Sequence, residues 1–219
     1  MITRIEVSTP DIENTYLDID PETKHGFLID PGAAPDQIAD AIRSGGFTIE
    51  KILLTHGHFD HIGAIDAIRE AFGHPPVYIH EAGLRYLSST FFNLSGPMGR
   101  PFTVEGAIPF QDGAVFSLQS NPAFSLRAIH VPGHSEDSTL LYSESGGYAF
   151  SGDTVFQGAV GATHFPGGDD EKLASSIRDR VLTLPPDTKF YPGHGEPTVL
   201  SREIPLLRRV AGLREIPQA

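Results

Sequence analysis

Short, mostly apolar runs alternate with helix-like segments in the first half of the chain. Each run is four or five residues long and is followed by polar residues, glycine or proline, which is typical of β-strands. Strands are predicted at residues 15–19, 26–29, 51–54 and 77–80. Between them, apolar residues recur at intervals of three and four, as on one face of an α-helix. Helices are therefore predicted at residues 35–43, 61–72 and 81–88.

The second half follows the same plan after an irregular segment. Residues 90–109 are rich in glycine, proline and phenylalanine, which predicts a loop that covers a site. Further strands are predicted at residues 114–118, 126–131, 139–142, 148–151 and 189–191. Helices are predicted at residues 169–182 and 201–213, the last with an apolar face that suits either a core or a subunit interface. Strands mixed with helices in both halves favour sheets packed together with helices outside.

Length and composition fit one globular domain, which we predict to span residues 1–219. Acidic residues outnumber basic ones by 28 to 16, and the formal charge of −12 argues against a nucleic-acid partner. No apolar run approaches the roughly 18 residues of a membrane span, and Arg4 and Glu6 interrupt any signal peptide. We therefore expect a cytoplasmic protein with a small-molecule substrate and no membrane partner, while its oligomeric state stays open.

The strongest chemical signal is a cluster of histidine and aspartate directly after a predicted strand. His56, His58, Asp60 and His61 lie within six residues. Because the chain has no cysteine, a metal site has to use the nitrogen and oxygen ligands of histidine and carboxylates. Four such ligands in so short a segment cannot all reach one ion without strain, which favours two ions. The alternative for Asp60 alone is a simple helix cap.

Three further segments place a glycine beside a potential ligand after a predicted strand. They are Gly133-His134, Gly152-Asp153 and Gly193-His194. Glycine permits a sharp turn that projects the neighbouring side chain into a shared cleft. One such segment alone would be an ordinary turn, but three of them together with the histidine cluster predict a common metal site.

These motifs resemble those of the metallo-β-lactamase superfamily, and within it the glyoxalase II-like (hydroxyacylglutathione hydrolase-like) hydrolases. The resemblance extends from about residue 14 to residue 197 and rests on Thr55-His56-Gly57-His58-Phe59-Asp60-His61-Ile62-Gly63, Gly133-His134, Ser151-Gly152-Asp153-Thr154-Val155-Phe156 and Pro192-Gly193-His194-Gly195. It implies an α+β fold, a four-layer αβ/βα sandwich in which two mixed β-sheets pack face to face with helices outside. It further implies a metal-ligand set in which His56, His58 and His134 hold the first ion, Asp60, His61 and His194 hold the second, and Asp153 lies between them.

The implied activity is that of a dinuclear metal-dependent hydrolase that cleaves a thioester or similar small carbonyl substrate. Two divalent ions, with zinc favoured and iron or manganese as alternatives, can share a water and present hydroxide as the nucleophile. Asp60 is expected to orient this hydroxide and shuttle its proton, and Asp153 is the second catalytic carboxylate. No side-chain nucleophile is needed, so Ser135, Ser138 and Ser151 are not expected to act as one.

Several positions depart from the glyoxalase II-like pattern or leave a role open. Ala162 stands where that family has a lysine or arginine for glutathione, and His164 either substitutes for it or is a bystander. Glu136 and Asp137 follow His134, and we expect solvated carboxylates there rather than metal ligands. Residues 91–102 line an apolar substrate pocket or simply cover the core. Asp30 either supports the site from behind or only forms a turn.

Four other functions are alternatives. A mononuclear iron persulfide dioxygenase would need only two histidines and one aspartate, here His56, His134 and Asp153. A lactonase or other small-ester hydrolase would use the full ligand set. A nuclease is disfavoured by the acidic charge, and a non-catalytic binding protein by the completeness of the ligand set.

Overall fold

The computed structural model describes residues 1–8 and 12–213, and two six-stranded β-sheets form the centre of the fold. The first sheet has the order β1 (Ile2–Ser8), β2 (Ile12–Ile19), β3 (His25–Ile29), β4 (Thr48–Leu53), β5 (Val77–His80) and β6 (Ile108–Phe110). The second has the order β14 (Thr198–Val199), β13 (Lys189–Pro192), β10 (Tyr148–Gly152), β9 (Thr139–Ser143), β8 (Ser125–His130) and β7 (Val115–Ser117). Both sheets are mixed, because β3 to β6 run parallel beside an antiparallel β1–β2–β3 meander, and β10 and β13 are parallel within an otherwise antiparallel sheet.

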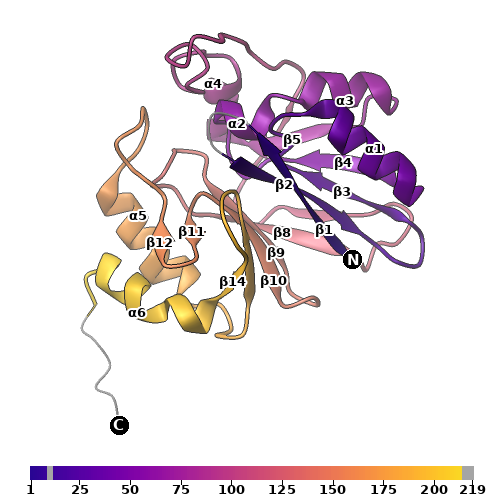
Figure 1. The fold of residues 1–219 in the computed structure, drawn as a ribbon. Helices are drawn as coiled ribbons and strands as arrows, with labels where there is room; N and C mark the ends of the chain where they lie inside the picture. Colours follow the sequence, from indigo (N-terminus) through magenta and orange to yellow (C-terminus); the bar gives the residue numbers. More distant parts are fainter. Residues whose placement is uncertain (9–11, 214–219) are drawn as a thin grey trace.

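Helices cover the outer face of each sheet (Figure 1). The helices on the first sheet are α1 (Pro35–Gly45) and α3 (Ile65–Ala71), and those on the second are α5 (Asp170–Ser176), which continues as a π-turn (Ile177–Val181), and α6 (Leu200–Val210). Shorter elements near the strand ends are α2 (Phe59–Ile62), a 3₁₀ turn (Glu81–Gly83), α4 (Leu84–Leu87) and the two-stranded ribbon β11 (Val155–Phe156) and β12 (Ala159–Val160). The predicted four-layer αβ/βα sandwich is therefore confirmed.

The alternation of side chains along the strands explains the layers. In β3, Phe27 and Ile29 point into the core between the two sheets, whereas Leu28 points to the helices outside. In β9, Leu141 points inward, and its neighbour Leu140 packs under α5 and α6. Successive residues of a strand face opposite sides of the sheet, so strands buried on both faces read as continuous apolar runs. Those runs are what the sequence pattern detects.

Two differences from the predicted elements have clear physical reasons. The helix predicted at 61–72 is divided into α2 and α3, because the Ala64 amide donates to the Pro31 carbonyl (2.9 Å) and Gly63 packs on the Gly32 carbonyl. Strand β1 was not predicted, although Ile5 and Val7 are buried and Glu6 between them is exposed. It is an edge strand with one wetted face, a weaker signal than a buried run.

The C-terminal helix packs on the second sheet, with Leu207 buried and Ile204, Val210 and Leu213 around it, so its apolar face belongs to the core. Within residues 1–8 and 12–213, no helix is both long and apolar enough to cross a membrane.

Candidate metal centre

All seven predicted ligands come together where the strand ends of the two sheets meet. His56 and His58 follow β4, and Asp60 and His61 lie on the short helix α2. The remaining three, His134, Asp153 and His194, follow β8, β10 and β13 of the second sheet. The alternative role of Asp60 as a helix cap does not hold, because α2 begins one residue earlier, at Phe59, and no side chain caps it.

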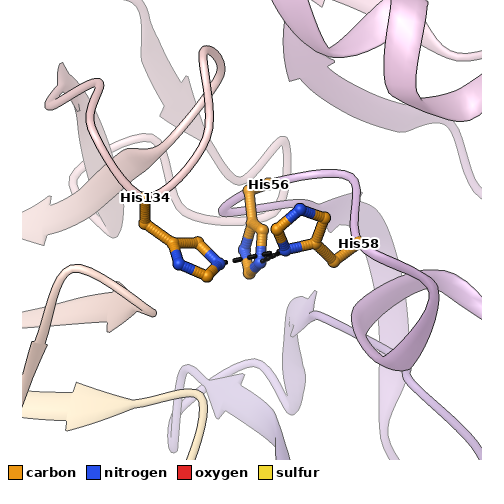
Figure 2. Close-up of side chains that lie close together, drawn as sticks. All are labelled: His56, His58 and His134. Carbon is orange, nitrogen blue, oxygen red and sulfur yellow. Dashed lines mark hydrogen bonds between the residues drawn. The ribbon is translucent and has the colours of Figure 1, made fainter. Parts of the chain in front are cut away.

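His56, His58 and His134 form the first cluster, which we call the three-histidine group (Figure 2). The His58 Nδ1 atom lies 3.1 Å from His56 Nε2 and 3.0 Å from His134 Nε2. Nitrogens that share a tetrahedral zinc at 2.0–2.1 Å lie roughly 3.3 Å apart, so this spacing suits one metal ion. Figure 2 shows the three rings directed at a common point from two different loops.

Asp60, His61 and His194 form the second cluster, which we call the carboxylate group. The Nε2 atom of His194 lies 3.3 Å from Asp60 Oδ2, and the Nε2 atom of His61 lies 3.9 Å from the same oxygen. Asp153 stands between the two groups, with Oδ1 3.4 Å from His61, and Oδ2 3.4 Å from His194 and 3.6 Å from His134. One carboxylate therefore faces ligands of both groups.

The outer nitrogens of His134 and His194 make hydrogen bonds that leave the inner nitrogens for a metal. The Nδ1–H of His134 donates to the Ala162 carbonyl, and that of His194 donates to the Ile12 carbonyl, both at 2.7 Å. An imidazole that donates from one nitrogen presents a lone pair on the other, as metal-binding histidines do. Among the described residues, His61 Nε2 and Asp153 Oδ1 are buried without a hydrogen-bond partner. Divalent ions at the two groups would satisfy these atoms, so the residues fit the predicted cofactor.

Burial makes the three-histidine group electrically neutral. It lowers the pKa of His56 well below its usual range, helped by the neighbouring His61 and His58. It also lowers the pKa of His58 to about 3, with His134 adding to the effect. The pKa of His134 is lowered for the same reason. Neutral imidazole is the form that binds a metal, so these three rings need not lose a proton at neutral pH.

Charge dominates the carboxylate group. Burial alone would lower the pKa of His194, but the carboxylates of Asp153 and Asp60 outweigh it and raise the pKa to about 10. Burial also acts to lower the pKa of His61, but Asp153 and Asp60 outweigh it and raise this pKa well above its usual range. In turn, burial would raise the pKa of Asp153, but the charge of His61 holds it well below the usual value. The pKa of Asp60 is lowered in the same way.

Asp30 orients one ligand of each group, which decides its open role in favour of supporting the site. Its Oδ2 atom accepts from His61 Nδ1 at 3.1 Å and from the Thr55 hydroxyl at 2.6 Å, and Oδ1 accepts from the Thr55 amide at 2.8 Å. The Thr55 Oγ1 atom lies 3.2 Å from His56 Nδ1, so it can accept from that ring. Carboxylates behind metal-binding histidines fix the tautomer and the ring orientation.

Sequence reasoning missed Glu13, which lies beside the same histidine. Its side chain is completely buried in β2, with Oε1 3.7 Å from His61 Nδ1 and Oε2 accepting from the Thr15 hydroxyl at 3.1 Å. Burial raises the pKa of Glu13 well above its usual range. A single acid two residues before a predicted strand carries no sequence signal of such a position.

Two glycines are required by the close packing of this centre. Gly152, directly before Asp153, has a φ of 46°, in the left-handed region that favours glycine. Gly193, directly before His194, leaves no room for a side chain, because a Cβ atom there would lie 2.4 Å from Asp153 Oδ1 and 2.5 Å from His61 Cε1. The Gly-ligand pairs in the sequence thus reflect both backbone conformation and space.

The serines near the ligands do not form a nucleophile. Ser135 and Ser138 share a hydrogen bond between their hydroxyls (2.7 Å), and the Ser151 hydroxyl donates to the Val155 carbonyl at 2.9 Å. None of these described hydroxyls bonds to a histidine, so a serine–histidine pair is absent from them.

The expectation of solvated carboxylates after His134 is correct for Glu136 and wrong for Asp137. Glu136 is partly exposed and pairs with Arg85 at 3.2 Å. Asp137 is completely buried beside Gly57 and Gly83, and burial raises its pKa to about 7. The tight loop returns the chain into the core at this residue, which composition alone does not show.

The segment after Ala162 lies over the three-histidine group. Phe165 contacts His58 and His134 edge-on, with ring centroids 5.8 and 6.1 Å away, and His164 packs on Phe165 at 4.1 Å. Phe165 therefore shields the centre, a role that its sequence context did not indicate.

Comparisons with known proteins agree with this fold. The chain matches the metallo-beta-lactamase superfamily over residues 8–194. A probable metallo-hydrolase of Streptococcus pyogenes, M6_Spy0554, is 36% identical over 194 residues, which are 87% of this chain and 82% of the relative. The hydroxyacylglutathione hydrolase GloC of Haemophilus influenzae is 31% identical over 186 residues, which are 83% of this chain and 85% of GloC. The crystal structure of TTHA1623 in a di-iron-bound form has a TM-score of 0.81 and 34% identity, and the match covers 92% of this chain and 96% of that one.

The chain therefore belongs to the metallo-β-lactamase superfamily, as its motifs predict. This membership confirms the predicted class of enzyme, a metal-dependent hydrolase, and the fold family implies divalent metal ions.

Proposed function

We propose that this protein is a dinuclear metal-dependent hydrolase that cleaves a thioester or similar small carbonyl substrate. The position of Asp153 carries the proposal, because its two oxygens face His134 of one group and His61 and His194 of the other at 3.4 to 3.6 Å. A carboxylate shared in this way suits two adjacent cations. The similarity to a hydroxyacylglutathione hydrolase supports a thioester as the substrate.

The ligands favour zinc, with iron or manganese as alternatives. His56, His58 and His134 would hold the first ion, Asp60, His61 and His194 the second, with Asp153 between them. Nitrogen and oxygen donors without sulfur suit all three metals, and the di-iron neighbour supports iron as a real alternative. When bound, two such ions lower the pKa of water and polarise a substrate carbonyl.

Asp60 and Asp153 are the catalytic carboxylates in this proposal. The neighbouring histidines keep the pKa of Asp60 low, so its carboxylate is ionised and can accept a proton at neutral pH. Asp153 holds the two groups together through its contacts with both. Phe165 restricts access of bulk water to the centre, which strengthens polar interactions inside it.

A substrate panel on the metal-loaded protein tests the proposal. We expect release of thiol from acylglutathione and from simple acyl thioesters, with loss of at least about 99% of the rate in His134→Asn, since outer-shell partners alone cost 10–100-fold. The matched control is His74→Asn, an exposed histidine with a φ of 57°, a conformation that asparagine tolerates.

Lactones and β-lactams are tested as further substrates, and oxygen uptake is measured with glutathione persulfide. Faster turnover of lactones than of thioesters would move the assignment to a lactonase of the same fold. Persulfide-dependent oxygen uptake without hydrolysis would overturn the proposal in favour of an iron dioxygenase.

A further inference from the structure

A cleft lies against the helix that carries two of the predicted ligands. It has a volume of about 610 Å³, within the range of small-molecule sites. Phe59 and Gly63 form one wall, and Met98, Arg100 and Phe102 form another. We call it the Arg100 cleft. The irregular segment predicted to cover a site or the core thus contributes Met98 and Phe102 to a cavity.

Helix α2 separates the Arg100 cleft from the metal centre. Phe59 and Gly63 flank the helix on the cleft side, and Asp60 and His61 reach into the centre from the residues between them. Gly32, also in the cleft wall, packs so closely that a Cβ atom there would lie 1.7 Å from the Asp60 carbonyl. The cleft and the metal centre therefore lie on two sides of one four-residue helix, and a substrate that occupies both has to pass around this helix.

The segment with Arg100 is held in place by buried polar groups. The Arg100 amide donates to the Ser95 carbonyl at 2.9 Å, and the Phe102 amide donates to the Ser95 hydroxyl at 3.1 Å. Asn93 is completely buried, its side chain donates to the Phe102 carbonyl (2.9 Å), and its own carbonyl accepts from the Phe59 amide (2.8 Å). The cleft wall is thus tied to α2, which makes it part of the site's scaffold.

Arg100 differs from Arg85 and Arg4, which both have carboxylate partners. Arg85 pairs with Glu136 and stacks on Phe92 at 3.6 Å, and Arg4 pairs with Glu6 and Glu196. Arg100 is exposed, and no carboxylate of residues 1–8 and 12–213 lies within ion-pair distance of it. In a chain with a formal charge of −12, an unpaired guanidinium beside two phenylalanines is complementary to an anion with an apolar stem.

We propose that the Arg100 cleft binds the carboxylate-bearing end of the substrate, with Arg100 on the carboxylate and Phe59, Met98 and Phe102 on the apolar part next to it. This inference rests on the proposed function and narrows its substrate to anionic thioesters or esters. Helix α1 begins at Pro35 in the same wall without a side-chain cap, and its positive end adds to the attraction.

Paired substrates test the cleft. S-Butanoyl-3-mercaptopropionate carries its carboxylate on the thiol side, and the S-ethyl monothioester of glutaric acid carries it on the acyl side. The corresponding amides are the neutral partners. For the metal-loaded wild type we expect kcat/KM to favour the anion in at least one pair, mainly through KM. In Arg100→Gln this preference should fall by about tenfold, as expected for loss of a charge-assisted contact. Arg178→Gln, which removes an exposed arginine on the π-turn, should keep it.

A second measurement separates failure of this inference from failure of the proposed function. Calorimetry with the non-hydrolysable thioether S-(2-oxopentyl)-3-mercaptopropionate should show binding to the wild type about tenfold tighter than to Arg100→Gln. If no thioester is cleaved but this difference is found, the cleft is an anion site and the proposed reaction is wrong. If Arg100→Gln keeps both the anion preference and the affinity for the thioether, the inference is overturned.

Discussion

The three-histidine group and the carboxylate group are adjacent, yet they are prepared for a metal in opposite ways. In the first, burial keeps His56, His58 and His134 neutral, so their lone pairs are free. In the second, carboxylates hold protons on His61 and His194. Ligand type alone therefore does not define a site, because the charge around each ligand decides whether a proton has to leave before a metal binds.

Asp153 is the residue that both groups share, so its removal should have the largest effect. We expect Asp153→Ala to retain fewer than two metal ions per chain and to lose more than about 100-fold of the hydrolysis rate, beyond the cost of an outer-shell partner. Elemental analysis and thiol release measure the two effects, with exposed Asp66→Ala as the control. Two retained ions and normal rates in Asp153→Ala would show that the two groups do not depend on a shared carboxylate.

Competition between protons and metal ions for the histidines should give the second-largest difference between the two groups. His194 has a pKa of about 10 and stays protonated between pH 8 and pH 6, so each displaced proton weakens binding about tenfold per pH unit. The pKa values of the three-histidine group are lowered, and His58 at about 3 stays neutral throughout this window. Zinc titrations against a chelator should therefore show one equivalent weakened at least about 100-fold from pH 8 to pH 6 and the other nearly constant. Equal slopes for both would contradict the assignment.

Substitution of Asp30 should have a smaller effect on metal affinity, and this effect should reach both groups. In Asp30→Asn an amide replaces one of the oxygens that accept from Thr55 and His61, so one of those bonds is lost. We expect a loss of roughly 10–100-fold in metal affinity, as for other carboxylates behind metal-binding histidines. Competition with a chelator at pH 8 measures it. An affinity equal to wild type would mean that Asp30 only forms the turn.

Substitution of Glu13 should change metal affinity least, although Glu13, like Asp30, lies beside His61. Burial raises its pKa, which favours the neutral carboxyl, and glutamine preserves the oxygen that accepts from Thr15. We expect Glu13→Gln to change metal affinity by less than about threefold and the free energy of unfolding by less than about 1 kcal/mol. A tenfold weakening of the carboxylate-group ion would show instead that Glu13 is ionised and acts on His61.

Much of the sandwich could be predicted from the sequence, because strands buried on both faces and amphipathic helices leave strong patterns. Runs such as residues 51–54 and 77–80 mark β4 and β5 to within a few residues. Edge strand β1 was missed, and the division of the helix at Gly63 was hidden, because that break depends on a contact with the distant Pro31–Gly32 turn.

The candidate ligands could be found because they follow strands in short, glycine-flanked motifs. The groups around them could not, since their positions follow from packing between distant segments. Glu13 and Asp137 are buried acids that the sequence presents like any others, and Phe165 reaches the centre only through the path of its loop. Arg100 has no motif, and its unpaired position becomes visible only beside the cleft.

The metal stoichiometry of protein prepared without added metal tests whether the centre is dinuclear. Elemental analysis should find about two divalent ions per chain, zinc alone or with iron or manganese, together with thioester hydrolysis. No bound metal, or a single iron with persulfide-dependent oxygen uptake, would contradict a dinuclear hydrolase.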